Sequence, residues 1–400
     1  MRRPTMKEKI ALPSELITAL DRCDILVGKE TLDYFYDLYD PDTGGFYYSI
    51  SSRDAQNMTP FAEGTCFVLE NLLDGGMTLP DWYRDKVCAW ILPHQNPLDG
   101  YFYEELWGKN TSGPRRDRDL MYSMDILTKM CCVNPLYPLP QERLRENCRD
   151  NTQPEYLAGE KEMCAYLDSL DWSTKSIWKT GQKLAMAAPL IDAAGLFDFV
   201  YEYVKEKQNP ETGLWGEGLG WMNTNGAMKL SSYFCDPMHP YPRVEKMLDS
   251  VLTICQGNVP ATSATWNWNP FVALNNAIHS MGENAETIRE KLIEKGADIV
   301  NGAIDNALRL KRADGGFASS IYRATPTQQG YLFGYGLEKE SDMDGTVIAG
   351  HRLRSTIYSV FDVPCTHDYY RKYETEFWNR IQTKAPIIKT LPAPQLSNVR

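Results

Sequence analysis

The sequence predicts an all-α fold in which helical hairpins close into an (α/α)6 toroid. A turn motif recurs along the 400 residues, the segments between the turns have the period and length of helices, and no alternating strand run competes with them. An open stack of hairpins usually has polar caps and solvent-exposed turns, whereas these turns carry large aromatic residues. The pattern therefore favours a closed ring of inner and outer helices.

The repeated turn combines an acidic or amide residue, a glycine and an aromatic residue. It occurs at residues 40–46, 96–102, 209–215 and 313–317. Proline removes its predecessor from the helical region and glycine permits positive φ, so each segment is expected to reverse the chain. The aromatic residue is expected to fill a gap between helices. The spacing fits six units of about 55 residues, with degenerate turns near residue 155 and at 265–270.

Helical segments are expected on both sides of these turns, because apolar residues recur there at helical period. In chain order they are residues 13–36, 60–73, 117–132, 175–208, 243–255, 270–281, 285–310 and 343–360. Residues 1–383 are expected to form one toroid domain. Residues 384–400, which contain three prolines, are expected to form an extended tail.

The composition is that of an ordinary globular protein, with 43% hydrophobic and 24% charged residues. A net charge of −11 without a long basic run argues against nucleic-acid binding. No apolar stretch is long enough to span a membrane and no signal-peptide core follows Met1, so a cytoplasmic location is expected. The ten cysteines include no C-x-x-C pair, which favours reduced thiols. A small-molecule substrate is the expected partner, and homo-oligomerisation stays open.

Two of the turns, at residues 95–102 and 208–215, have the form Q-N-P-x-x-G-x-W/F. This form resembles the glutamine–tryptophan repeats of the terpene cyclase and protein prenyltransferase superfamily. Through the four turns the resemblance spans most of the chain. It implies a toroid of paired helices, which is the scaffold of that superfamily.

A second resemblance lies at Asp342-Met343-Asp344-Gly345-Thr346. This segment looks like the D-x-D-D-T acid motif of class II terpene cyclases such as squalene–hopene cyclase, which implies that Asp344 protonates an alkene and that Asp342 tunes it. Gly345 stands where the motif has another aspartate. Prenyltransferase β-subunits hold zinc with Asp-x-Cys near the equivalent turn. The cysteine is absent here, so no metal or cofactor is expected, although a diphosphate substrate would bring Mg²⁺.

Four helix starts occupy the same relative place after their turns, at residues 59–63, 115–119, 223–229 and 342–346. If all four belong to inner helices, their N-termini meet at one mouth of the ring and favour anions. The substrate-binding residues expected there are Glu63, Arg115, Arg116, Arg118 and Lys229. The guanidinium fork suits diphosphate or carboxylate oxygens. Surface ion pairs of the arginines with Asp117 and Asp119 are the alternative.

Further substrate-binding residues are expected from three other segments: Trp266, Trp268, Tyr331 and His351. The two tryptophans are candidates to line a cavity. Tyr331 lies in the glycine- and aromatic-rich loop at 318–341, which suits a lid or an ordered surface loop. His351 lies two turns beyond Asp344 and could partner it or simply be hydrogen-bonded. Asp342 and Asp344 could also serve as helix caps.

Three functions follow from these residues. The first is a class II terpene cyclase-like enzyme, an isomerase or lyase, in which Asp344 is the general acid and aromatic residues shield a carbocation. The second is a carbohydrate-active toroid, a lyase or hydrolase on acidic sugars, with Tyr122 or a histidine as base and Trp266 or Trp268 stacked on sugar. The third is a noncatalytic toroid that binds a partner. The lining of the central cavity distinguishes these functions. It should be aromatic and dry in a terpene cyclase-like enzyme, polar with tryptophans in a carbohydrate-active enzyme, and wide and featureless in a noncatalytic toroid.

Overall fold

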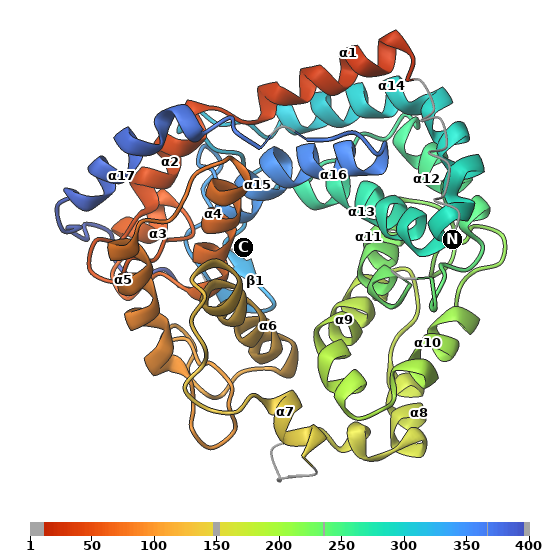
Figure 1. Ribbon diagram of the computed structural model, residues 1–400, viewed down its shortest axis with the longest axis horizontal. Helices are drawn as coiled ribbons and strands as arrows, with labels where there is room; N and C mark the ends of the chain where they lie inside the picture. The colour runs from red at the N-terminus through yellow and green to blue at the C-terminus, as the bar shows by residue number, and fades with distance from the viewer. Residues whose placement is uncertain (1–11, 147–152, 235–236, 366, 396–400) are drawn as a thin grey trace, which may run out of the picture.

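The computed structural model describes residues 12–146, 153–234, 237–365 and 367–395 (Figure 1). This part of the chain is mostly helical, which confirms the expected helical class. Its one sheet is an antiparallel pair, β1 (Thr327–Gln328) and β2 (Tyr331–Leu332). Gln329 and Gly330 both have positive φ, 49° and 88°, as a two-residue hairpin turn requires. Strands this short have no alternation that the sequence could reveal.

One set of helices lies around the middle of the molecule (Figure 1). It comprises α4 (Ala62–Asp74), α6 (Gly113–Met124), α9 (Ile177–Ala193), α11 (Trp221–Leu230), α13 (Ala264–Met281), α15 (Met343–Val347) and α16 (Leu353–Val360). The π-helical turn η7 (Ile348–Arg352) joins α15 to α16. Each helix of this set packs against the next, from α4 to α6, α9, α11, α13 and α16, and α15 packs against α4.

A second set lies outside the first (Figure 1). It comprises α1 (Ser14–Arg22), α2 (Lys29–Leu38), α5 (Asp81–Ile91), α8 (Glu160–Ser169), α10 (Phe197–Glu206), α12 (Val244–Cys255), α14 (Glu286–Leu308) and α17 (Glu374–Gln382). α1 shows how such a helix is held: Leu16, Ala19 and Leu20 are buried on one face, and the helix packs along α14.

Short elements connect these helices. They are η1 (Cys23–Leu26), α3 (Ile50–Asp54), η2 (Leu92–His94), η3 (Asp125–Met130), α7 (Pro140–Arg145), η4 (Glu155–Ala158), η5 (Ser231–Tyr233), η6 (Gly282–Ala285) and η8 (Arg371–Tyr373). No helix of the described ranges is both long and apolar enough to cross a bilayer.

The four repeated turns share one backbone geometry. In the first, Asp40 N donates to Gly45 O and Gly44 N donates back to Asp40 O, both at 2.9 Å. The turns that begin at Asn96 and Asn209 repeat this pair of bonds, and the turn at Arg312 repeats it in a loop one residue shorter. The first glycine of each loop has the positive φ that was expected: Gly44 83°, Gly100 79°, Gly213 65° and Gly315 98°.

The aromatic residues of the turns fill the interior, as expected. They are Phe46, Phe102, Trp215 and Phe317, each at most 1% exposed. The glutamines before two turns fasten them to a later loop. The Gln95 amide donates to Gly100 O and Tyr137 O, and its oxygen accepts from the Tyr137 amide. Gln208 donates in the same way to Gly213 O and Pro242 O.

The expected degenerate turn at 265–270 is wrong, because these residues lie inside α13. The Ser263 hydroxyl accepts from Trp266 N and starts the helix well before Pro270. Pro270 is tolerated in the helix although proline normally disfavours it. Near residue 155 the chain forms the single turn η4. The long helices expected at 13–36 and 175–208 are each divided, by η1 and by Gly195.

The C-terminal segment runs along the N-terminal helices. Lys384 Nζ donates to Tyr36 O, Asp37 O and Tyr39 O at the end of α2, at 2.5–2.9 Å. Lys389 Nζ donates to Ala55 O and Met58 O just after α3. Thr390 and Leu391 add backbone bonds to Asp54. The tail is thus extended and hydrogen-bonded as far as the described residues reach.

Candidate functional site

A group of buried ion pairs joins α4 to α6. Arg118 Nε donates to Glu63 Oε1 at 2.7 Å, and Arg115 Nη2 lies 2.7 Å from Glu63 Oε2. Arg115 also binds Asp119 one helical turn later, at 2.6 Å. Glu63, Arg115 and Asp119 are at most 1% exposed. The two guanidinium groups lower the pKa of Glu63 to about 2 against the effect of burial, so this carboxylate is ionised and fully engaged.

Asp342 caps the helix that carries the acid motif. Its two carboxylate oxygens accept hydrogen bonds from the amides of Gly345, Ser319 and Thr325 and from the Ser319 hydroxyl, at 2.5–2.9 Å. The side chain is fully buried. Burial raises its pKa and these hydrogen bonds oppose the rise. Asp342 therefore fixes the start of α15 and the loop at 319–325.

Gly345 lies where no larger residue fits. A Cβ at this position would lie 2.3 Å from the carbonyl carbon of Ala318 and 2.4 Å from Ser319 N. Both atoms belong to the backbone, so the clash could not be relieved by moving a side chain. A further aspartate at position 345 is therefore sterically excluded.

Asp344 differs from Asp342 in its exposure and in its hydrogen-bond partners. It is half-buried, and its carboxylate makes no hydrogen bond or close ion pair within the described residues. Burial and the charge of Glu63 together raise its pKa to about 8, although Arg118 opposes the rise. At neutral pH this carboxyl group is therefore largely protonated and free to donate a proton.

Lys229 approaches the same region from α11. Gly181 of α9 lets the two helices meet at its base, because a Cβ there would lie 2.7 Å from Lys229 Cβ. Burial and the charge of Arg118 together lower the pKa of Lys229 to about 7. Asp344 and Glu63 act on it in the opposite direction, so helices on different sides of the site are electrostatically coupled. Its ammonium group has no hydrogen bond within the described chain.

Arg352 of η7 completes a central cluster, defined as Glu63, Arg118, Lys229, Asp344 and Arg352. Both Nε and Nη2 of Arg352 bind the carboxylate of Glu70 on α4. Its guanidinium carbon lies 4.2 Å from the Phe67 ring and 5.7 Å from the Trp268 ring. Arg352 was not among the expected site residues. Its place two turns after Asp344 on one helix face could have revealed it.

Further aromatic residues expected at the site lie on β2 and α13. Tyr331 of β2 lies 5.4 Å from Trp107 between ring centroids, and its hydroxyl accepts from Ser112 N at the start of α6. The loop at 318–341 is thus an ordered cover over α6 in this structure. Trp266 and Trp268 are half-buried on α13, and Trp268 donates to Thr356 at 2.9 Å.

Two expected residues lie away from the cluster. Arg116 lies over the Tyr101 ring at 4.0 Å on another face of α6. His351 is 2% exposed and is hydrogen-bonded to Asp74 and Tyr369, both at 2.8 Å, so it partners Asp74 rather than Asp344. Tyr122 lies on α6 with Arg118 over its ring, and burial raises its pKa, which makes it a poor base.

Glu70, Asp74 and His351 bring three metal-ligating atoms within 4.8 Å of one another. Glu70 is already bound by Arg352, and Asp74 by His351. A cation there would face the Arg352 guanidinium at close range, so we assign no metal to this group.

Glu104 is a buried carboxyl group that was not among the expected site residues. It accepts from Ala62 N at 2.6 Å, at the start of α4. Burial and the charge of Asp119 together raise its pKa to about 8. Nothing in the local sequence distinguishes it from its exposed neighbour Glu105.

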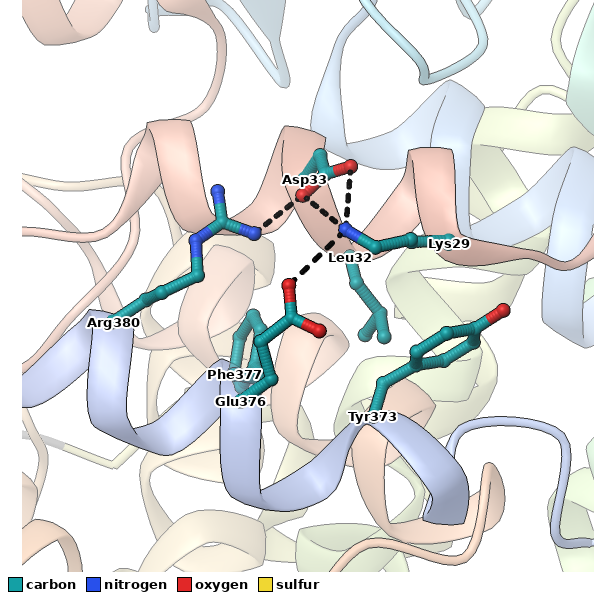
Figure 2. Close-up of a pocket in the computed structure, with 7 residues that line it drawn as sticks. All are labelled: Lys29, Leu32, Asp33, Tyr373, Glu376, Phe377 and Arg380. Carbon is teal, nitrogen blue, oxygen red and sulfur yellow. Dashed lines mark hydrogen bonds and ion pairs between the residues drawn. The ribbon is translucent and has the colours of Figure 1, made fainter.

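A separate small hollow lies between α2 and α17, lined by charged and apolar side chains (Figure 2). Asp33 binds Arg380 at 2.5 Å and Lys29 at 3.4 Å, and Lys29 also reaches Glu376. These half-exposed charges satisfy one another, and none is a predicted site residue. The hollow therefore does not compete with the central cluster as the candidate site.

Neither a comparison with known protein families nor a search of curated proteins found a match to this chain. The function of the protein is accordingly inferred from the geometry and chemistry of the central cluster.

Proposed function

We propose that the helices form a closed (α/α)6 toroid and that the central cluster is the active site of an enzyme acting on acidic sugars. The successive packing from α4 through α16, and of α15 on α4, supports the closed arrangement. Under this proposal the inner helices hold the reacting groups, and the outer helices and the buried aromatic turns keep them in place.

One observation carries the functional part: several polar groups of the cluster have no partner in the described chain, yet they are not sealed from solvent. They are the Asp344 carboxyl, Lys229 Nζ and the Nη1 atoms of Arg118 and Arg352. The remaining guanidinium nitrogens are engaged with Glu63 and Glu70. Unpaired polar groups that are open to solvent and act electrostatically on one another offer several hydrogen-bonding positions to a polar ligand.

The charges around Asp344 favour this function over the terpene cyclase-like one. Arg118 and Arg352 are fixed cations, and a carbocation formed beside them would be repelled rather than stabilised. A carboxyl group with a pKa of about 8 is also a weak acid for an alkene. It is well matched to an oxygen leaving group at neutral pH. A noncatalytic toroid gives no reason for this matched set of titrating groups.

The proposed substrate carries a carboxylate on a sugar ring. The unpaired Nη1 atoms of Arg118 and Arg352 would bind the carboxylate oxygens. The half-buried Trp266 and Trp268 on α13 offer ring faces for sugar stacking. Asp344 would donate a proton to the glycosidic oxygen. This arrangement corresponds to a polar lining with tryptophans.

Replacement of Asp344 with Asn tests the proposal. We expect wild-type protein to cleave at least one uronate-containing oligosaccharide and D344N to lose about 10²–10⁴-fold in kcat with an unchanged far-UV circular dichroism spectrum. The exposed Glu105 provides the matched control, because E105Q removes a carboxylate outside the cluster. Full activity of D344N, or neither binding nor cleavage of any acidic oligosaccharide by the wild type, would contradict the proposal.

A further inference from the structure

The carboxylates that act on Asp344 are not available as a second acid–base group beside it. Glycoside hydrolysis normally uses two carboxyl groups, one as acid and one as base or nucleophile. The carboxylates that act electrostatically on Asp344 are Glu63 and Asp342. Both oxygens of Glu63 are held by arginines, and both oxygens of Asp342 are held by the α15 cap. Neither can take a proton from water without breaking a buried contact.

The free group that remains is the amine of Lys229. It comes from α11, whereas Asp344 comes from α15, so the two reach the cluster from different helices. Each acts on the electrostatics of the site, yet they form no ion pair within 4.0 Å. Both are half-buried and unpaired in the described chain. A substrate between them would contact a protonated carboxyl group and an amine.

Building on the function proposed above, we propose that the reaction is β-elimination from a uronate and that Lys229 is its catalytic base. Arg118 and Arg352 bind the substrate carboxylate and so acidify the proton on the adjacent ring carbon. Lys229 Nζ takes this proton. The electrons of the C–H bond form a carbon–carbon double bond, and the bond to the glycosidic oxygen breaks. Asp344 protonates that oxygen.

The reaction consumes no water and needs no oxidant or metal. It yields an unsaturated uronide and a new hydroxyl end. Lys229 then passes its proton to solvent and Asp344 regains one, which restores both groups. Burial and the cationic neighbours lower the pKa of Lys229 to about 7, so that a substantial fraction of the amine is neutral near that pH, as this step requires. A solvent-exposed lysine would be protonated and could not act as a base.

Product mass separates this inference from the proposed function. Elimination gives products whose summed mass equals that of the substrate, whereas hydrolysis adds one water. Mass spectrometry of wild-type digests of uronate oligosaccharides should therefore show an unsaturated end and no incorporation of ¹⁸O from labelled water. Saturated products with ¹⁸O would overturn the inference while leaving the proposed function standing. No cleavage of any acidic oligosaccharide would overturn both.

Variants of Lys229 test the role of the amine directly. Lys229→Arg keeps a cation that cannot be deprotonated, and we expect a loss of about 10²–10⁴-fold in kcat with little change in KM. Lys229→Ala should lose as much and regain activity with added ethylamine, increasingly as pH rises and the amine becomes neutral. Lys161→Arg, an exposed change on α8, is the control. Activity of K229R within threefold of wild type, or no amine rescue of a folded K229A, would overturn the assignment.

Discussion

Single residues decide the chemistry of the cluster through the partners they have. Asp342 and Asp344 lie two positions apart, yet one has four hydrogen bonds and the other has none within the described chain. The sequence motif identified both carboxylates as candidates and left capping open for each. It could not separate them, because the amides that engage Asp342 come from Ser319 and Thr325 in a loop whose path no local pattern specifies. Lys229 was expected at the helix start, but its low pKa depends on burial and on Arg118 and Arg352, which are distant in sequence.

At this scale Glu63 gives a prediction for stability. Its replacement with Gln removes the counter-charge of the buried Arg118 and one of the two carboxylates that pair with Arg115, which should lower the free energy of unfolding by about 3–5 kcal/mol. The pKa of Glu63 is depressed from 4.5 to about 2, so its contribution is complete above pH 4.5 and is lost as pH falls toward 2. Urea unfolding of wild type and E63Q at several pH values should show a difference that narrows in that range. A difference that stays constant with pH would contradict this account, and E105Q should be neutral.

Elements position these residues by close backbone approach. α15 is only five residues long, and it is held by its cap and by the contact of Gly345 with residues 317–319. The repeated turns could be predicted from the sequence because glycine, proline and aromatic residues have local effects. The start of the inner helix α13 was not predicted correctly, because it depends on the cap at Ser263 and not on Pro270. The helices that were missed, such as α5 and α8, have few local boundary signals other than burial.

Gly345→Ala is expected to be destabilising although alanine is the better helix former. The added Cβ meets backbone atoms at 2.3–2.6 Å, and such overpacking typically costs about 1–3 kcal/mol. Gly302 in α14 is the matched control, because nothing lies within 4 Å of the place that a Cβ would take there, and G302A should raise stability by about 0.5–1 kcal/mol. Thermal unfolding of both variants checks the opposite signs. Equal stabilisation by both would show that the loop at 317–319 yields to the new methyl group.

At the scale of the whole molecule, contacts between distant segments hold the site together. α1 packs on α14, α2 on α17 and α4 on α15. Lys384 and Lys389 fasten the tail to the ends of α2 and α3, and Tyr335 donates to Pro392 O from the loop that covers α6. The sequence predicted helices and turns well because these are local. It did not predict which tail residue would meet which carbonyl, since that choice depends on the packed molecule.

Truncation after Thr383 should loosen both the N-terminal helices and the covering loop. It removes the donors to Tyr36 O and Tyr39 O, and a hydrogen bond to a charged group contributes about 1.5–3 kcal/mol. We expect a lower melting temperature and faster proteolysis within residues 318–341. Lys384→Met should reproduce part of the loss, whereas Lys179→Met at an exposed site should not. Unchanged proteolysis of that loop after truncation would show that the Tyr335 contact does not restrain it.

The pairing of early helices with late ones bears on how the chain is made. Translation delivers the N-terminal helices first, and domains often begin to fold as they emerge from the ribosome. Here α1 lacks α14, α2 lacks α17 and α4 lacks α15 until these later helices have been synthesised. The apolar faces that these later helices cover therefore stay exposed during most of translation. We expect the nascent polypeptide to depend on chaperones until its release.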